Sequence, residues 1–380
     1  MPSSHVKAIE DYLNLKNRNA QAQAIRAAVK LGIINSLRSG QKSCIQLAEA
    51  NGCKTIQVEQ LMAILATTEL VECYGQDYAL SQIGRLIPDQ FLDFGDAFWE
   101  QLPKYVKTGV SVHDDPECDQ SEFDYVLQRA TEEWMMTPVA LDAAEVLGVA
   151  KHRKGQRILE VCCGSAVMGA TIAHKDPTSK VFLMDTAEGL ERADQTIESV
   201  GLEGRVEKVL IDDPNDMIGA DVEPNSFDVL IATNFLHTRS KEACEKFFQT
   251  ANAWLTQTGE MVLIDIFPGQ EHGELSRLVT AMELGLRTKS GQLYDPGVIK
   301  EMLKSCGFSH VQYLICHRHP ASMAWCWRGR AGRFLLARNG RHICSRGTCR
   351  LVPRNLESEN KASPERTALS VIHSFPGSAR

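Results

Sequence analysis

A short apolar strand followed by a turn of small residues constrains the fold of this chain most. Residues 157–161 form an apolar run that carries one acid, Glu160, and residues 162–166 are all small. A helix-like run follows, and residues 181–185 then predict a second strand that ends in Asp185. Strand, small turn, helix and strand with a terminal acid form the layout of a nucleotide-type site at the carboxyl ends of parallel strands. The terminal acid can accept hydrogen bonds from both hydroxyls of a ribose.

The turn itself limits which ligand this site could hold. A dinucleotide site would be rich in glycine, but Gly164 is the only glycine here, with Cys162, Cys163 and Ala166 around it. The missing glycines argue against a pyrophosphate at the helix N-terminus and favour a ligand with a ribose and no phosphate, such as S-adenosylmethionine. An ordinary buried strand–helix–strand unit without a ligand remains the alternative.

Composition indicates a globular protein with a large core. The chain has 380 residues, of which 43% are hydrophobic, and this length predicts two domains. No apolar run approaches the roughly 18 residues that a membrane span needs, and the N-terminus lacks a signal-peptide pattern. The twelve cysteines show no paired spacing typical of a metal site, and several lie within apolar patterns. We therefore expect reduced thiols, no metal and a cytoplasmic location.

Charge is distributed unevenly along the chain. Residues 328–380 hold eleven Lys and Arg against three Asp and Glu, so the rest of the chain has 30 basic and 45 acidic side chains. An acidic body gives no reason to expect a nucleic-acid partner. The basic segment has little periodicity, and we expect residues 341–380 to form a disordered tail.

The N-terminal part predicts helices followed by a hairpin. Residues 7–38 have helical spacing of alanine and leucine, with Gly32 where a helix would end, and two shorter helices follow. Residues 70–74 and 77–80 are β-like runs around Gly75 and Gln76. Helices with a small hairpin make a winged-helix module, and no basic recognition helix is present. We therefore interpret residues 1–92 as a dimerisation domain.

Residues 93–150 are mostly helical in pattern and rich in aromatic and sulfur side chains. Trp134 and Met135 could line an apolar substrate pocket, although packing between domains would require the same residue types. From residue 151 to 340, strands and helices alternate, which predicts an α/β domain with a mostly parallel sheet covered on both faces. The strands are expected at 157–162, 181–185, 206–211, 227–233, 260–266, 310–316 and 333–337.

Several polar side chains follow these strands and could carry chemistry. Asp212 and Asp213 come directly after residues 206–211 and could accept a hydrogen bond from an adenine amine, or be solvated loop acids. His237 stands just past the strand at 227–233, and histidine suits proton abstraction near neutral pH. Asp265 ends the next strand and could orient the imidazole.

Taken in order, these segments resemble the class I S-adenosylmethionine-dependent O-methyltransferases that carry an N-terminal winged-helix dimerisation domain, such as the caffeic-acid and hydroxyindole types. The resemblance spans roughly residues 15–340 and rests on the order and spacing of many short motifs. It implies a Rossmann-like sheet, an S-adenosylmethionine cofactor, a homodimer and methylation of a hydroxyl on a small secondary metabolite. The residues that match the family's binding and catalytic motifs are Glu160, Cys162, Gly164, Asp185, Asp212 and His237.

The chain departs from this family at several positions. Thr238 and Arg239 follow the histidine where Asp and Trp are usual, and Asp265 replaces the first orienting glutamate. The second glutamate should fall near residue 293, but the nearest acid is Asp295. An alternative is therefore a pericyclase or dehydratase on the same fold, which binds the cofactor without transferring methyl. A dimeric ligand-binding regulator is a third possibility.

The resemblance also places an acceptor pocket against the segment before residue 293. We expect Met282, Arg287 and Lys289 to contribute to it. In the pericyclase alternative, the two cations would polarise a substrate carbonyl. Formation of S-adenosylhomocysteine would separate the two enzymatic readings, because only a methyltransferase produces it.

Overall fold

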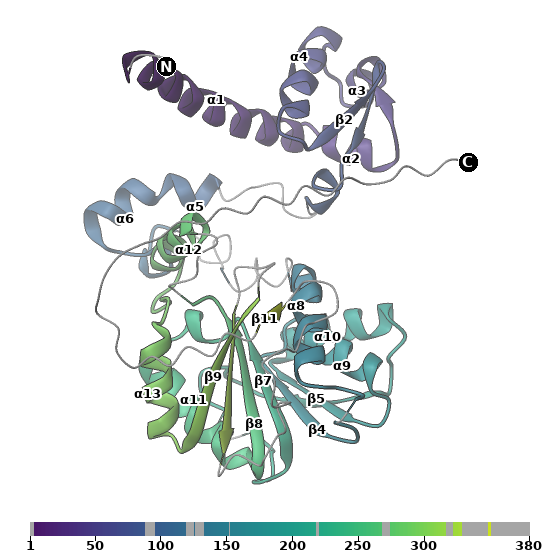
Figure 1. The fold of residues 1–380 in the computed structure, drawn as a ribbon. Helices are drawn as coiled ribbons and strands as arrows, with labels where there is room; N and C mark the ends of the chain where they lie inside the picture. The colour runs from purple at the N-terminus through teal and green to yellow at the C-terminus, as the bar shows by residue number, and fades with distance from the viewer. Residues whose placement is uncertain are drawn as a thin grey trace, which may run out of the picture.

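Two bodies of different construction make up the chain in the computed structural model. It describes residues 4–87, 96–118, 125, 133–151, 153–217, 220–267, 274–316, 322–328 and 349–350. A small helical module at the N-terminus lies beyond one end of a larger α/β domain, and helices α5 (Asp96–Glu100), α6 (Leu102–Thr108) and α12 (Glu274–Arg287) lie between them (Figure 1). No described helix is both long and apolar enough to cross a membrane.

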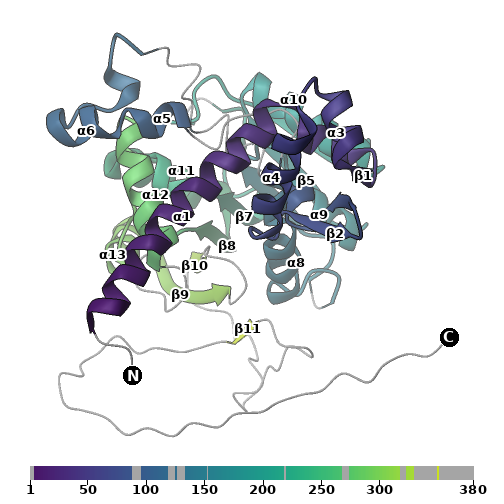
Figure 2. The same cartoon turned by 90° about the horizontal axis from the view of Figure 1, so that it is seen from above.

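The N-terminal module consists of helices and a three-stranded antiparallel sheet in the order β1-β3-β2. Its elements are α1 (Ser4–Lys30), α2 (Ile33–Arg38), β1 (Lys42–Ser43), α3 (Cys44–Ala50), α4 (Thr55–Ala66), β2 (Val71–Tyr74) and β3 (Asp77–Leu80). Gly32 adopts a φ of 75°, which separates α1 from α2, and Gly75 at 69° allows the tight turn of the hairpin. The predicted helices and hairpin are thus confirmed, and α1 extends across the end of the α/β domain (Figure 2).

Short helical segments connect the module to the sheet. They are η1 (Gly84–Leu86), α5 (Asp96–Glu100), α6 (Leu102–Thr108), η2 (Val112–Asp114), η3 (Glu133–Met136) and α8 (Thr137–Val146). Helix α6 begins with a proline in its first turn and ends at Gly109, whose φ is 71°. These are the usual start and stop residues of a helix.

The α/β domain contains an eight-stranded sheet in the order β11-β9-β10-β8-β7-β4-β5-β6. Its strands are β4 (Arg157–Val161), β5 (Lys180–Asp185), β6 (Val206–Leu210), β7 (Phe227–Thr233), β8 (Leu255–Asp265), β9 (Phe308–Cys316), β10 (Ser322–Arg328) and β11 (Cys349–Arg350). Strands β4 to β8 pair in parallel, while β9 and β10 pair antiparallel. The predicted mostly parallel, Rossmann-like sheet is therefore confirmed. Because β4 has β5 on one side and β7 on the other, the strand order reverses beside β4, where open α/β sheets bind ligands.

One predicted strand lies outside the described residues, and one observed strand was not predicted. The range 333–337 lies outside the described residues, whereas β10 enters the sheet between β8 and β9. Within 341–380, the described residues 349–350 form β11 beside β9, and the rest of that range lies outside the description.

Helices cover both faces of the sheet (Figure 1). They are α8, α9 (Val167–Lys175), α10 (Ala187–Ser199), α11 (Lys241–Trp254) and α13 (Pro296–Ser305). One apolar core packs α8, α9 and α10 against the sheet, and a second packs α11 and α13 against the opposite face. Side chains of Thr186, Ser240 and Asp295 accept hydrogen bonds from the first turns of α10, α11 and α13. These caps fix where each helix starts. The caps of α10 and α11 lie in loops at the carboxyl edge of the sheet.

Candidate active site

The turn after β4 is held in an unusual backbone conformation. Cys162, Gly164 and Ala166 all lie in the left-handed region, with φ of 50°, 52° and 54°. Glycine adopts this conformation freely, whereas for cysteine and alanine it costs roughly 1–3 kcal/mol each. The surrounding structure must compensate for that cost, and such strain is concentrated at functional sites.

Asp185 fastens this turn to the end of the neighbouring strand β5. One carboxylate oxygen accepts a hydrogen bond from the backbone N–H of Gly164 at 2.8 Å, and the other accepts from the N–H of Thr186 at 2.7 Å. The residue is buried. Since each carboxylate oxygen has two lone pairs, Asp185 retains acceptors for a ligand.

Glu160 lies within the sheet directly before the turn. It is fully buried, and one of its oxygens accepts from the N–H of Gly169 in α9 at 2.6 Å. Burial, with the charges of Glu133 and Asp185 adding to it, raises the pKa of Glu160 to about 8. Glu160 therefore supports the turn as a neutral acid at neutral pH rather than as an exposed ligand.

The structure adds a carboxylate that sequence reasoning missed. Glu133, in η3, accepts a hydrogen bond from the N–H of Ser165 at 2.5 Å. A Cβ atom at position 164 would meet its two carboxylate oxygens, so a larger residue there would displace the end of the Glu133 side chain. Burial raises the pKa of Glu133. The only sequence signal was an acid within an apolar, aromatic segment.

Cys162 is a member of the turn, but its thiol is not reactive. Burial raises its pKa to about 12, although the nearby Arg239 acts in the opposite direction. A thiol in this state is not a nucleophile at neutral pH. Its contribution is made through the backbone of the turn.

Asp212 and Asp213 lie on the loop after β6, and both are exposed. The Asp213 carboxylate accepts from the N–H of Asn215, as in a local turn. The structure places them at the predicted edge, but the role in adenine binding stays a prediction.

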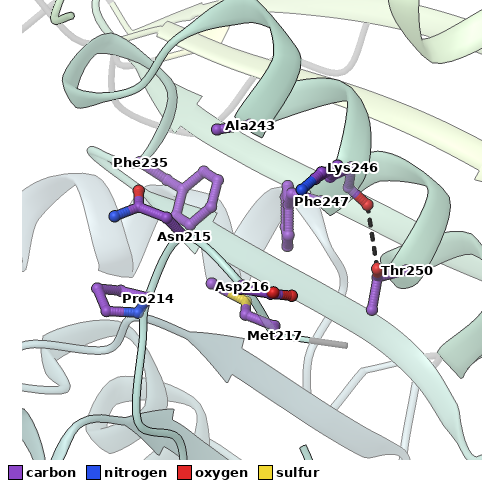
Figure 3. Close-up of a pocket in the computed structure, with 9 residues that line it drawn as sticks. All are labelled: Pro214, Asn215, Asp216, Met217, Phe235, Ala243, Lys246, Phe247 and Thr250. Carbon is purple, nitrogen blue, oxygen red and sulfur yellow. Dashed lines mark hydrogen bonds between the residues drawn. The ribbon is translucent and has the colours of Figure 1, made fainter. Parts of the chain in front are cut away.

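A small cavity adjoins this loop on the side of α11 (Figure 3). Its volume is about 10 Å³, enough for one water molecule and far too small for a metabolite. The residues that line it are Pro214, Asn215, Asp216, Met217, Phe235, Ala243, Lys246, Phe247 and Thr250. It is therefore a packing gap beneath the loop.

His237 and Asp265 form a buried pair, as the sequence predicted from their strands. His237 lies in the short helix η4 (Leu236–Thr238) after β7, and Asp265 ends β8. The distance between His237 Nδ1 and Asp265 Oδ1 is 2.5 Å, and both side chains are 2% exposed. Such a carboxylate fixes the ring orientation and the tautomer of a histidine.

Asp265 is held as an anion at this position. Its two oxygens also accept from the backbone N–H groups of Leu236 and Ile266, both at 2.7 Å. Burial opposes ionisation, but the contact with His237 and these hydrogen bonds outweigh it and lower the pKa of Asp265. An ionised Asp265 can only accept, so His237 Nδ1 carries the proton and Nε2 remains available as an acceptor.

Tyr125 meets the other nitrogen of the imidazole. It is the one described residue between 118 and 133, and its hydroxyl lies 3.3 Å from His237 Nε2. The two rings meet edge to face, with centroids 5.9 Å apart. The hydroxyl of this phenol therefore occupies the position that a proton donor to the base must reach.

Arg239, which stands where the resembling family has tryptophan, connects three loops. Its guanidinium lies 3.7 Å from the ring centroid of Phe235 and donates to the carbonyls of Phe235 and Pro214 and to the sulfur of Cys162. The loops after β4, β6 and β7 are thus joined through one cation. The family's tryptophan is replaced here by a charged structural residue.

The predicted acceptor-pocket residues differ in burial, and their role in binding an acceptor stays a prediction. Arg287 is buried, pairs with Glu283 at 2.7 Å and lies over the rings of Phe98 and Tyr125, at 4.2 and 5.3 Å. Met135 is half-buried, whereas Met282 and Lys289 are exposed. The side chain of Trp134 lies outside the description. Asp295, the displaced acid, caps α13 by accepting from Gly297.

Comparisons with known proteins agree with this geometry. A family model described as "O-methyltransferase dimerisation domain" matches residues 14–87, and one described as "Methyltransferase small domain" matches residues 142–290. The mitomycin biosynthesis 6-O-methyltransferase of Streptomyces lavendulae is 22% identical over 274 residues, which are 64% of this chain and 74% of that protein.

Two solved structures share the fold. The mitomycin 7-O-methyltransferase is 18% identical, with a TM-score of 0.68, and the match covers 86% of this chain and 99% of that one. Human N-acetylserotonin methyltransferase, solved in complex with S-adenosylmethionine, is 18% identical with a TM-score of 0.65, and the match covers 87% and 100% of the two chains. The dimerisation-domain match thus precedes the methyltransferase-domain match, and the chain belongs to the class I S-adenosylmethionine-dependent O-methyltransferases with an N-terminal dimerisation domain.

Proposed function

We propose that this enzyme transfers a methyl group from S-adenosylmethionine to a hydroxyl of a small secondary metabolite, with His237 as the general base. The buried pair of His237 and Asp265 at the carboxyl edge of the sheet carries this proposal. The relatives support the reaction class, since the printed names describe O-methyltransferases of mitomycin biosynthesis and an N-acetylserotonin methyltransferase.

The residues at the turn after β4 fit this cofactor chemically. S-adenosylmethionine carries ribose hydroxyls, which are donors, and two cationic groups, and the turn is flanked by the carboxylates of Glu133 and Asp185. Asp185 would hold the ribose, and the backbone of Cys162 and Gly164 would lie against the ligand. When bound, the cofactor supplies an electrophilic methyl group on its sulfonium.

The protein's own contribution to the reaction is to remove a proton. With Nδ1 protonated and bound to Asp265, Nε2 of His237 can accept the proton of an acceptor hydroxyl as the oxygen forms its bond to the methyl carbon. Asp265 then stabilises the imidazolium ion. Its negative charge, 2.5 Å away, lowers the cost of placing that cation in a buried site.

No observation favours the pericyclase or dehydratase alternative. That reading needs cations free to polarise a substrate carbonyl, but Arg287 is paired with Glu283 and Lys289 is exposed. Methyl transfer uses groups that the site already presents in a usable arrangement.

The reaction is tested by incubating the protein with methyl-labelled cofactor and a panel of phenols, hydroxyindoles and hydroxyquinones. Labelled methyl ether and S-adenosylhomocysteine should form in equal amounts with at least one acceptor. Conversion of an acceptor without S-adenosylhomocysteine would instead indicate pericyclic or dehydrative chemistry.

Cofactor binding is tested separately by calorimetry on Asp185→Ala. Hydrogen bonds to a charged group contribute about 1.5–3 kcal/mol each, so the affinity should fall at least tenfold. Asp194→Ala is the matched control, because Asp194 forms only a surface pair with Lys208. Equal affinity in both variants would remove Asp185 from the ribose site.

We propose in addition that the enzyme is a cytoplasmic homodimer without a nucleic-acid partner. Residues 1–92 would form the dimerisation domain, residues 93–150 the substrate segment and residues 151–340 the catalytic domain. The exposed apolar side chains of α1 support the dimer, among them Tyr12 and Leu15, which are 61% and 64% exposed in the single chain. Eight of the described cysteines are free thiols, which supports a reducing compartment.

A further inference from the structure

The carboxylate of Glu133 occupies the position at the start of α9 where an anionic ligand would ordinarily bind. Backbone N–H groups that precede a helix attract anions, and the N–H of Ser165 is already donated to Glu133 at 2.5 Å. The carboxylate also lies directly over Gly164. A methionyl carboxylate could not use the same N–H unless Glu133 left it.

The surroundings of Glu133 are strongly acidic. Asp185 accepts from the N–H of Gly164, the residue beneath Glu133. Arg192 lowers the pKa of Glu133, but burial and Asp185 raise it, and the net direction is upward. Arg192 itself donates to Glu188 at 2.9 Å. A cation placed against Glu133 would therefore relieve both desolvation and repulsion.

The carboxylates of Asp185 and Glu133 contact adjacent backbone N–H groups of the turn, those of Gly164 and Ser165. Asp185 and Glu133 both contact residue 164, one at its N–H and the other above its Cα. If Asp185 held the ribose, a methionyl chain that ran along residues 164–165 would reach Glu133. That chain ends in an ammonium and a carboxylate, and only the ammonium is attracted by this environment.

We propose that Glu133 binds the α-ammonium of the cofactor's methionyl group and keeps the start of α9 closed to its carboxylate. This inference rests on the proposed function, since it concerns the same cofactor. It assigns a second anchor to the ligand, at the end opposite the ribose.

The test uses calorimetry with ligands that differ in the methionyl group. Glu133→Gln keeps the shape of the side chain and removes its charge. The control is Glu145→Gln, in α8, whose carboxylate is exposed and pairs with Lys151 at 2.9 Å. The ligands are S-adenosylmethionine, S-adenosylhomocysteine and methylthioadenosine, which has the ribose and adenine but no ammonium or carboxylate.

We expect Glu133→Gln to bind S-adenosylmethionine and S-adenosylhomocysteine about tenfold or more weakly, because both carry the ammonium. The affinity for methylthioadenosine should stay within twofold of the parent value. Decarboxylated S-adenosylmethionine should bind the parent protein at least as well as the intact cofactor, since the carboxylate gains nothing from Ser165. The Glu145→Gln control should match the parent throughout.

Three results would overturn this inference. An equal loss with methylthioadenosine would mean that Glu133 only supports the turn. Unchanged or tighter cofactor binding by Glu133→Gln would mean that Glu133 contacts no cation, or that its carboxylate competes with the methionyl carboxylate of the cofactor. Much weaker binding of decarboxylated S-adenosylmethionine than of the intact cofactor would mean that the protein binds the methionyl carboxylate. If the parent protein bound none of these ligands, the proposed function would fail as well.

Discussion

The hydroxyl oxygen of Tyr125 lies 3.3 Å from Nε2 of His237, the nitrogen that must accept a proton from the acceptor. Because Nδ1 donates to Asp265, Nε2 is the acceptor in this contact and the phenol is the donor. The buried phenol thus makes the same hydrogen bond that a substrate hydroxyl would make. An acceptor can reach the base only after this hydrogen bond is broken.

Removing the hydroxyl should therefore help the acceptor to bind. Tyr125→Phe keeps the ring against His237 but deletes the competing donor, and one hydrogen bond contributes about 0.5–1.5 kcal/mol. The KM of the acceptor should fall roughly two- to tenfold, with cofactor affinity unchanged, in steady-state assays. A loss of kcat would instead show that the phenol positions the imidazole.

Replacing the base should abolish most of the activity. General-base catalysis contributes about 10²–10⁴-fold, so His237→Gln should lower kcat at least a hundredfold while calorimetry shows intact cofactor binding. Asp265→Asn should cost less, because Asp265 orients the ring and stabilises its cation without touching the acceptor. Full activity of the His237 variant would refute its role as base.

Glu160 makes the stability of the unliganded protein depend on pH. Its pKa is about 8 in the folded chain and near 4.5 when unfolded, so the folded state binds more protons between these values. The contribution of Glu160 to the free energy of unfolding should be fully present below about pH 4.5 and should be lost as pH rises to about 8.

The loss is on the order of 1.4 kcal/mol for each pH unit across that interval at most. Glu160→Gln cannot ionise, so denaturant unfolding of this variant should show a flatter profile between pH 6 and 9. Parallel profiles for the two proteins would mean that Glu160 is ionised in the folded state.

The exposed apolar face of α1 should be needed for the dimer. Ile9 and Leu13 lie one turn apart and are 49% and 48% exposed in the single chain. Replacing both with glutamate should yield a monomer in light scattering, because charges would be buried at the interface. Glutamates at the exposed polar positions Asn14 and Asn17 serve as the control. A dimer that persists in the Ile9 and Leu13 variant would place the interface elsewhere.

Features set by chain order were predictable from the sequence. Asp185, His237 and Asp265 each follow or end an apolar strand, and parallel strands bring their carboxyl ends to one edge. Position on that edge and residue chemistry together were enough to pair His237 with Asp265, which the structure places 2.5 Å apart. The α/β architecture followed from the same alternation.

Features set by contacts between distant segments were not predictable. Glu133 reaches Ser165 across 32 residues, and Tyr125 reaches His237 across 112, without any local pattern that marks either. Strand β10 was missed because an antiparallel strand inserted beside β8 needs no crossover helix, and helices were the signal used to count strands. We predicted Lys289 as an acceptor-pocket residue from its segment alone, and the structure shows that its side chain is exposed.

Arg239 has a consequence for how the edge of the sheet opens. The guanidinium of Arg239 donates hydrogen bonds to Cys162, Pro214 and Phe235, which lie on three different loops. If any of these loops moved away, the buried cation would lose a hydrogen-bond partner. Amide protons of the three loops should therefore exchange with solvent as one cooperative unit, at a common opening free energy. An Arg239→Leu variant would let each loop exchange at its own rate. Arg239, which stands where the family has tryptophan, thus makes the loops after β4, β6 and β7 unfold together.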